Sequence, residues 1–140
     1  AVAVRPTAQT ENIPMEAIKI EDGLNQEQRK TLKKLIDVLE QFRTLDPDMP
    51  TQTLLSFLYC KVLENEEDFA TVRMVAEKLR TSSSSASRNI LAHTQHNRQL
   101  KGGTNLVETF ENPLKRNEKV VRYTPKGERM LESILSRLSD

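Results

Sequence analysis

The sequence predicts a mainly α fold with a small amount of β structure, the winged helix-turn-helix class. Two observations lead to this prediction. First, two short segments with apolar residues at helical spacing meet at Arg80 and Thr81, with no Gly or Pro from Thr71 to Arg98. Second, two strand-like segments follow Thr104, as expected for a two- to three-stranded antiparallel wing. Helices expected before and after these segments would complete the core.

The first 23 residues differ from the rest of the chain. They contain Pro6 and Pro14, show little apolar periodicity and mix polar with apolar side chains. Such a segment has little patterned apolar surface to bury, so we expect an extended or disordered arm over residues 1–23. The winged helix-turn-helix domain is then expected over residues 24–140. A content of 36% hydrophobic residues in the chain is sufficient for one modest core.

Two helices are expected before the helix-turn-helix. Asn25 is a suitable N-cap with Gln28 in the capping-box position, and Asp46-Pro47 would end the first helix. Its apolar stripe consists of Leu32, Leu35, Ile36, Leu39 and Phe42. The second helix begins near Pro50 and is apolar on most sides, which is typical of the central helix of such a domain. Its apolar residues are Leu54, Leu55, Phe57, Leu58, Val62 and Leu63.

The helix-turn-helix is expected from Thr71 onward. Thr71 can cap a short helix, and the apolar residues of that helix are Val72, Val75, Ala76 and Leu79. After the turn, the Ser82 hydroxyl can accept the free backbone amide of Ser84 or Ser85 and so cap a second helix. The inward stripe of that second helix consists of Ala86, Ile90 and His93.

The opposite face of this second helix carries Ser84, Ser87 and Arg88 and is therefore narrow, polar and cationic. Short serines let a backbone approach a DNA groove closely, and arginine can bind guanine O6 and N7 with two hydrogen bonds. Four consecutive serines can also indicate a flexible linker. The flanking patterns favour a helix, because a mobile linker would leave both short helices without a packing partner.

The wing is expected over residues 106–123. Apolar and polar residues alternate over residues 106–111, Asn112-Pro113 breaks the strand, and a second strand-like run covers residues 120–123. Residues 114–119 lie between the two runs and include three basic side chains. The sequence therefore predicts a wing with a basic tip.

A helix is expected at the end of the sequence, because Thr124 is a suitable N-cap and Pro125 suits the first helical position. The apolar face of this amphipathic helix consists of Met130, Leu131, Ile134, Leu135 and Leu138. A single copy of a chain of this size would leave part of that face uncovered, which favours a homodimer. The alternative is that the same residues close the core of the monomer.

Together, the helix-turn-helix, the wing and the Thr-Pro-Lys-Gly sequence at residues 124–127 resemble the MarR family of winged-helix transcription regulators, over about residues 49–138. The resemblance implies double-stranded DNA as the partner, with the helix from Ser82 in the major groove and the wing at phosphates or in the minor groove. The implied DNA-binding residues are Ser82, Ser83, Ser84, Ser87 and Arg88 on the helix and Lys115, Arg116, Asn117 and Lys119 on the wing.

Three features depart from the family pattern. The wing carries Lys115-Arg116-Asn117 where the family has Asp-x-Arg, so the internal wing salt bridge is missing and Arg116 is expected to take the minor-groove role. The segment of residues 93–104 is several residues longer than the family's usual connection between the recognition helix and the following strand. It would either lengthen the recognition helix or form a basic loop. Only residues 125–140 follow the wing, so the family's dimer does not carry over directly.

The distribution of charge agrees with a DNA-binding surface. The formal net charge of the chain is only +1. Residues 1–81 carry 11 basic and 14 acidic side chains, residues 82–129 carry 9 and 4, and residues 130–140 carry 1 and 2. Positive charge therefore gathers on the predicted reading helix and wing, as an electrostatic footprint on DNA requires. An ordinary solvated charged face is the alternative explanation.

Catalysis and metal binding have little support in the sequence. There is no phosphate-binding glycine loop, serine-nucleophile elbow or pair of catalytic carboxylates. Cys60 lies on the apolar second helix without a basic neighbour, which favours a buried structural thiol. His93 and His96 lack further ligands at metal-site spacing and are expected to pack against helices or to lie near phosphates. We therefore expect no enzyme, no cofactor and no metal.

The single cysteine suits a reducing compartment, and the sequence has neither a signal peptide nor a long apolar run. These features predict a cytoplasmic protein with no membrane contact, in a bacterium or in the bacterial host of a phage. The expected function is sequence-specific binding of double-stranded DNA to regulate transcription, as a repressor. Two alternatives stay open: a winged-helix protein-interaction module, and an architectural or replication DNA-binding protein of a phage or plasmid.

Overall fold

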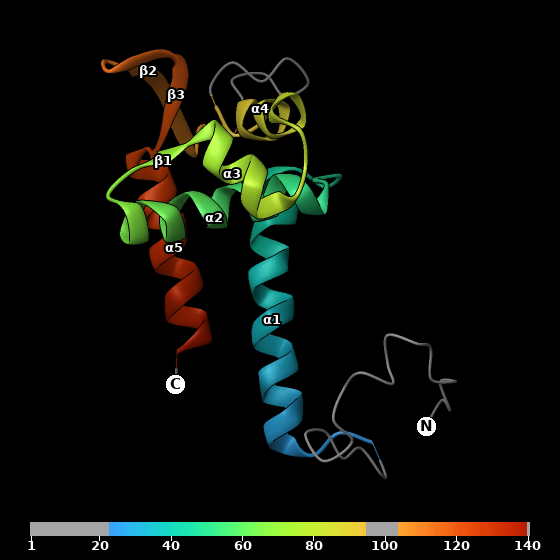
Figure 1. Ribbon diagram of the computed structural model, residues 1–140. Helices are drawn as coiled ribbons and strands as arrows, with labels where there is room; N and C mark the ends of the chain where they lie inside the picture. The colour runs from blue at the N-terminus through green and yellow to red at the C-terminus, as the bar shows by residue number, and fades with distance from the viewer. Residues whose placement is uncertain (1–22, 95–103, 140) are drawn as a thin grey trace. The chain divides into compact units, whose positions relative to one another are not determined.

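The computed structural model describes residues 23–94 and 104–139, and within them the chain forms five helices and three strands (Figure 1). In chain order these are α1 (Gln26–Leu45), α2 (Thr51–Glu67), β1 (Ala70–Thr71), α3 (Val72–Leu79), α4 (Ser83–Leu91), β2 (Val107–Asn112), β3 (Lys115–Tyr123) and α5 (Pro125–Leu138). The fold is the predicted mainly α winged helix-turn-helix, with a three-stranded antiparallel sheet. The arm predicted for residues 1–23 lies outside the described residues except for Gly23.

Helix α1 begins at the predicted capping box. The backbone N–H of Gln28 donates to Asn25 Oδ1 at 2.8 Å, and the backbone N–H of Asn25 donates to Gln28 Oε1 at 3.1 Å. The helix ends at Leu45, immediately before Asp46, as predicted. The chain consists of two compact units, residues 1–36 and residues 37–140, and the boundary between them lies within α1.

Only part of the predicted apolar stripe of α1 is buried. In the first unit, Leu32, Leu35 and Ile36 are 45%, 50% and 48% exposed. In the second unit, Val38 and Phe42 are buried in the core. Of the predicted stripe, Phe42 is therefore buried, whereas Leu32, Leu35, Ile36 and Leu39, which is 45% exposed, are not.

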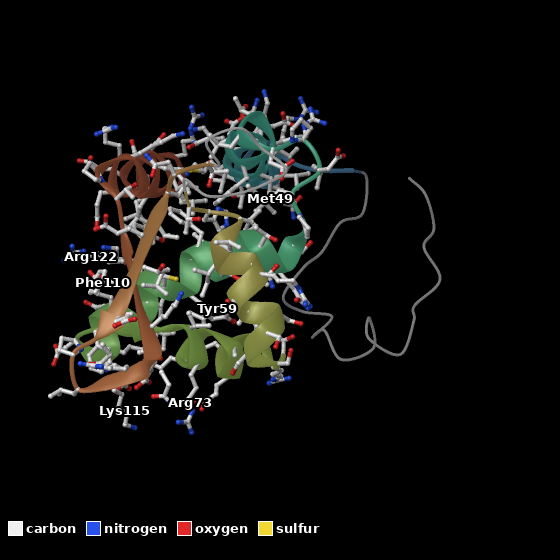
Figure 2. The ribbon with its side chains drawn as sticks, turned by 90° about the horizontal axis from the view of Figure 1, so that it is seen from above. Met49, Tyr59, Arg73, Phe110, Lys115 and Arg122 are labelled. Atoms are coloured by element: carbon white, nitrogen blue, oxygen red, sulfur yellow. The ribbon has the colours of Figure 1, made fainter. Side chains whose placement is uncertain are left out.

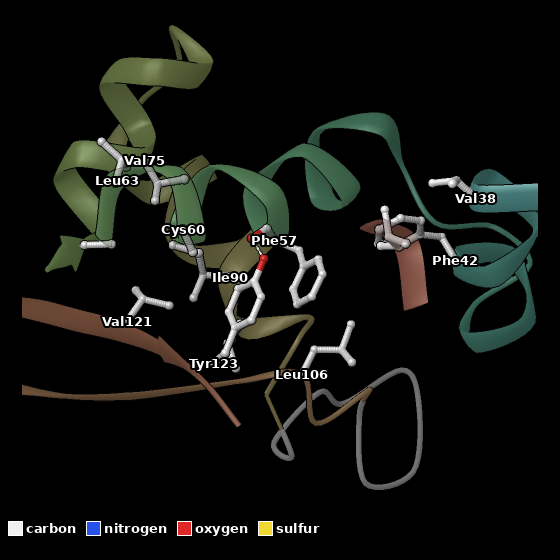
Figure 3. Close-up of a cluster of buried hydrophobic side chains, with 13 residues drawn as sticks. Val38, Phe42, Phe57, Cys60, Leu63, Val75, Ile90, Leu106, Val121 and Tyr123 are labelled. Carbon is white, nitrogen blue, oxygen red and sulfur yellow. Dashed lines mark hydrogen bonds between the residues drawn. The ribbon is translucent and has the colours of Figure 1, made fainter. Parts of the chain in front are cut away.

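Aromatic packing around α2 organises the core (Figure 3). The Phe57 ring stacks on the Tyr123 ring with centroids 4.2 Å apart, and Phe42 meets Phe57 edge-on at 5.9 Å. The Tyr123 hydroxyl donates to the Phe57 carbonyl at 2.6 Å, which joins α2 to the end of β3. Burial raises the pKa of the Tyr123 phenol, so this donor keeps its proton.

The buried face of α2 is more polar than the sequence suggested. Its buried residues are Thr53, Ser56, Phe57, Cys60 and Leu63, which recur at helical spacing. Val62, predicted as part of the apolar surface, is 45% exposed because it lies off this stripe. Cys60 is a buried thiol as predicted, and burial together with the nearby Glu64 raises its pKa to about 12.

The helix-turn-helix consists of α3 and α4. Thr71 Oγ1 accepts the backbone N–H of Met74 at 3.2 Å and caps α3 as predicted. Arg80 ends α3 in the left-handed region with φ 55°, which reverses the chain direction. Ser82 Oγ then accepts the backbone N–H of Ser85 at 3.1 Å and caps α4. Three of the four serines, Ser83 to Ser85, are therefore helical, Ser82 is their N-cap, and the run does not form a linker.

The strands are arranged in the order β1-β3-β2, all antiparallel, with β3 in the centre. β1 contains only two residues, Ala70 and Thr71, which pair with Val121 and Val120 of β3. The sequence did not locate β1, because two residues are too short to show alternation. Since α3 follows β1 directly, this pairing fixes the start of the helix-turn-helix against the wing.

The turn of the wing is shorter than predicted, although basic residues still follow it directly. β3 already begins at Lys115, and a two-residue turn, Pro113 and Leu114, joins it to β2. Asn112 Oδ1 accepts the backbone N–H of Leu114 at 3.0 Å, which closes the turn early. The basic residues therefore lie on strand β3, and the exposed tip residue is Leu114, 92% exposed.

His93 connects three parts of the domain. Its Nε2 lies 2.6 Å from the Thr53 carbonyl on α2, and its Nδ1 lies 3.2 Å from Thr104 Oγ1. Its carbonyl accepts the backbone N–H groups of Leu106 and Val107. Burial lowers the pKa of this imidazole, so the neutral form bridges the two partners. His93 therefore packs in the core and does not face phosphates.

The segment after α4 was predicted either to lengthen this helix or to form a loop. α4 ends at Leu91, and its C-cap is Ala92, so lengthening is excluded for the described residues. Residues 95–103, which include His96, lie outside the described residues.

Helix α5 begins at the predicted cap. Thr124 Oγ1 accepts the backbone N–H of Gly127 at 3.1 Å, and Pro125 occupies the first helical position. Gly127 lies so close to the chain that a Cβ atom would stand 2.1 Å from the Leu106 carbonyl oxygen. Further along, Ile134 is buried, whereas Leu135 and Leu138 are 54% and 50% exposed.

No helix among the described residues is long and apolar enough to cross a membrane.

Candidate nucleic-acid interface

The outer face of α4 is polar. Ser83, Ser84, Ser87 and Arg88 are exposed, while Ala86 and Ile90 on the inner face are buried. The predicted division of this helix into two faces is therefore confirmed. Leu91, at the end of the helix, is also exposed at 46%. Because three of the four exposed polar side chains are serines, little bulk separates the first two turns of the helix backbone from a surface that approaches it.

Ser82 and Ser85 organise the start of this helix. Ser82 Oγ caps the helix and donates to Ser85 Oγ at 3.1 Å. Arg88 Nη2 donates to the same Ser85 oxygen at 3.1 Å, which leaves its other guanidinium donors on an exposed face. Ser82 was predicted to bind DNA, but its hydroxyl is already occupied by the cap. Its side chain therefore has less capacity for a ligand than the serines that follow.

A groove of about 360 Å³ lies between the start of α3, the start of α4 and strand β3. We call it the α3–α4–β3 groove, and its lining residues are Val72, Arg73, Ser83, Lys115, Asn117, Glu118 and Lys119. Figure 2 shows Arg73 and Lys115 at the same edge of the domain, on different elements. The groove thus combines side chains that are more than forty positions apart in the sequence.

An irregularity in β3 shapes one wall of this groove. Glu111 pairs with Lys119, whereas the next residue of β2, Asn112, pairs with Lys115. The residues between these partners, 116–118, therefore have no counterpart on β2 and form a bulge. A bulge re-aims side chains, and here Asn117 and Glu118 line the groove.

The groove carries an excess of positive charge. Three of its residues are cationic, Arg73, Lys115 and Lys119, and one is acidic, Glu118. Arg73 Nε lies 3.6 Å from Glu77 Oε1, but both side chains are about 70% exposed, so this ion pair is weak and solvent-screened. The Arg73 guanidinium is consequently available for a stronger anionic partner.

The structure brings together four of the nine predicted DNA-binding residues, namely Ser83, Lys115, Asn117 and Lys119. Ser84, Ser87 and Arg88 lie on the exposed face of α4 outside the groove, and Arg116 lies exposed on the bulge of β3. Arg73 was not predicted. It precedes the turn, and the pairing of β1 with β3, together with the packing of α3 on β3, brings its helix to the wing. Its contact with DNA, like that of the others, stays a prediction.

A second cavity of about 350 Å³ lies elsewhere in the second unit, and none of the predicted DNA-binding residues lines it. Its lining residues are Gln41, Thr44, Leu45, Leu106, Lys126, Arg129 and Met130. Among the described residues there is no cluster of three or more His, Cys, Asp or Glu side chains that could hold a metal ion.

Comparison with known proteins gives matches in structure alone. No protein-family model matches the chain, and no curated protein matches it. Staphylococcus aureus MepR in complex with DNA matches with a TM-score of 0.57 and 16% identity, over 78% of this chain and 76% of MepR. A MepR variant bound to an oligodeoxyribonucleotide matches with a TM-score of 0.56 and 16% identity, over 77% and 67% of the two chains.

A MarR-like transcriptional regulator from Thermotoga maritima also matches, with a TM-score of 0.50 and 22% identity over 81% of this chain and 75% of that one. At these identities the likeness concerns the fold. The chain therefore has the winged-helix fold of MarR-type transcription regulators, as the sequence resemblance predicted.

Proposed function

We propose that this chain binds double-stranded DNA sequence-specifically and regulates transcription, as a repressor that blocks access of polymerase. The observation that carries the proposal is the position of the polar, serine-rich face of α4 next to a cationic groove formed with the wing. The same fold is found in MepR, which has been crystallised with DNA.

In the proposed complex α4 lies in the major groove. Ser84 and Ser87 allow close approach of the helix, and the exposed guanidinium of Arg88 can reach the edge of a base pair. On the wing, Lys115 and Lys119 neutralise phosphates, which supplies affinity without sequence information. Arg116, exposed on the bulge, is the candidate for minor-groove contact.

A protein-docking module is the competing function for a winged helix. A docking face of that kind is usually apolar, since protein partners bury apolar patches. On α4 the exposed side chains at the start and middle of the helix are Ser83, Ser84, Ser87 and Arg88, and a serine-rich cationic surface suits a hydrated polyanion better.

We further propose that the protein acts as a homodimer. Leu135 and Leu138 on α5 are about half exposed, which is unusual for two leucines one helical turn apart. A second copy would cover such a face and place two α4 helices on two half-sites of a palindromic duplex.

Selection of binding sequences from random duplexes with the full chain tests the DNA-binding function. We expect an enriched motif. Arg88→Ala should then weaken binding to that motif by about ten- to a hundredfold and reduce discrimination against other sequences. Lys119→Ala should weaken binding to all sequences by a similar factor.

Arg43→Ala, which removes an exposed cation on α1 that pairs with Glu40, is the matched control and should leave binding unchanged. Selection that enriches no sequence, or an Arg88→Ala variant that still discriminates as the wild type does, would contradict the assigned role of α4.

A further inference from the structure

We infer that the α3–α4–β3 groove holds one backbone phosphate of a nucleic acid, bound by Arg73, Lys119 and Ser83, and that Glu118 limits the strength of this binding. The inference rests on the proposed function. It adds to that function a phosphate site between the two expected contact elements, and two residues, Arg73 and Glu118, that the sequence did not point to.

The chemistry of the groove matches a phosphodiester. Arg73, Lys115 and Lys119 provide donors with positive charge, and the Ser83 hydroxyl and the Asn117 amide provide neutral donors. The oxygens of a phosphodiester accept hydrogen bonds and carry a single negative charge. With Glu118 included, the charged side chains that line the groove leave a net charge of +2.

The position of the groove favours a polymer over a free phosphate ion. Arg73 is 69% exposed, and Lys115 and Lys119 are also exposed, so the groove alone would hold a small anion only weakly. A nucleic-acid strand that is held by α4 on one side and by the wing on the other presents its phosphate to the groove at high effective concentration. The occupant of the groove is therefore a phosphate of the nucleic-acid strand that passes between α4 and β3.

Glu118 opposes this binding. It lines the same groove and is the only acidic side chain that does so among the described residues. Its side chain is placed there by the bulge of residues 116–118, and a carboxylate near a phosphate repels it. The groove therefore contains both the attraction that holds a strand and a repulsion that keeps the complex easy to dissociate.

The experiment measures the dissociation constants of the full chain for a selected duplex and for an unrelated duplex, over a range of salt concentrations. Arg73→Gln should weaken binding to both duplexes by the same factor, and should make the slope of log K against log salt less steep by about 0.9. Glu118→Gln should tighten binding to both duplexes by about two- to fivefold, the size expected for a solvent-screened charge pair. Thermal unfolding checks that both variants keep their fold.

Arg43→Gln serves as the control, because it removes an equally exposed arginine outside the groove, and it should change neither affinity nor slope. If Arg73→Gln leaves the slope of log K against log salt unchanged, or weakens binding to the selected duplex alone, the phosphate site is overturned while the proposed function stands. A wild-type chain that binds inorganic phosphate in titration, with Arg73→Gln losing the phosphate and not the duplex, would also overturn it. If the wild-type chain binds no duplex at all, the proposed function fails and the site with it.

Discussion

Helices α4 and α5 begin in the same way but present different chemistry to their surroundings. Each is capped by a hydroxyl that accepts the backbone N–H three residues on, Ser82 from Ser85 and Thr124 from Gly127. Each buries one apolar stripe in the same domain. The first two turns of α4 expose serines and an arginine, with a single exposed leucine, Leu91, at the end of the helix, whereas α5 exposes two leucines one turn apart, Leu135 and Leu138.

Since both helices are capped in the same way and bury one side in the core, the chemistry that distinguishes them lies on their outward faces. A serine and arginine face suits a hydrated polyanion, and an exposed leucine face suits another apolar surface. The two regions should therefore respond differently to mutation, one in DNA affinity and the other in self-association.

The largest effect is expected where α5 meets the start of β2. Gly127→Ala would place a methyl group 2.1 Å from the Leu106 carbonyl oxygen, a backbone atom that also accepts the Thr124 N–H. Since backbone must move to make room, the free energy of unfolding should fall by about 3 kcal/mol or more. Chemical denaturation measures this. Ser136→Ala on the exposed side of α5 is the control and should change little, and an equal loss in both variants would refute the close approach.

The next effect concerns association. Leu135→Lys should weaken self-association at least about tenfold, because it places a charge on the proposed dimer face, and should leave duplex binding by a monomer intact. Sedimentation equilibrium at micromolar concentration measures the dissociation constant of the dimer. Ser136→Lys adds the same charge one position away as a control. Wild-type protein that sediments as a monomer at these concentrations would remove the proposed role of the α5 leucines.

A pH effect is expected from His93, which ties the end of the α4 region to α2. Burial lowers its pKa below the ordinary 6.5, although the Thr53 carbonyl and the Asp46 charge oppose this. The folded state therefore binds a proton less readily than the unfolded state. The contribution of His93 to stability is complete above pH 6.5 and is lost as the pH falls below 6.5 toward the folded pKa.

Unfolding free energies measured from pH 8 to pH 5 should fall more steeply for the wild type than for His93→Gln. The other histidine of the chain, His96, provides the comparison. If the pH dependence of the unfolding free energy remains in His93→Gln and disappears in His96→Gln, then His96 and not His93 causes it.

The smallest effect is expected at the surface of the wing. Arg122 Nη2 lies 3.0 Å from Glu108 Oε1, and its guanidinium carbon lies 4.8 Å from the centroid of the Phe110 ring. Both charged side chains are about half exposed or more, so Arg122→Gln should cost only about 0.2–1 kcal/mol of stability. A double-mutant cycle with Glu108→Gln isolates the pair. A loss of several kcal/mol would show that the wing depends on this contact for its fold.

The sequence predicted those parts of the molecule that depend on neighbouring residues. The caps at Asn25, Ser82 and Thr124 are contacts over three positions, and side-chain type and spacing are sufficient to identify them. The two faces of α4 follow from helical periodicity in the same way. For the same reason, the two helices before the helix-turn-helix and the order of the elements after them could be predicted.

Features that depend on distant residues were missed or wrong. The inward position of His93 was predicted from helical spacing, but its hydrogen-bond partner is a carbonyl forty positions away and could not be identified from local sequence. Arg73 lines the groove because β1 pairs with β3 and α3 packs on β3, and the turn of the wing is shorter because Asn112 closes it with its own side chain. The exposed face of α4 and the basic residues of the wing could therefore be predicted from the sequence. The groove that brings them together could be recognised only in the tertiary structure.

The two-residue strand β1 has a mechanical consequence. Ala70 and Thr71 stand directly before α3 and are hydrogen-bonded to the strand that carries the wing's basic residues. Together with the packing of α3 against α4 and β3, this pairing fixes the spacing between α4 and the wing. In the proposed complex, the width of the DNA groove would therefore affect binding as well as the bases, and we expect sequences with a narrow or a wide groove to bind with different affinity.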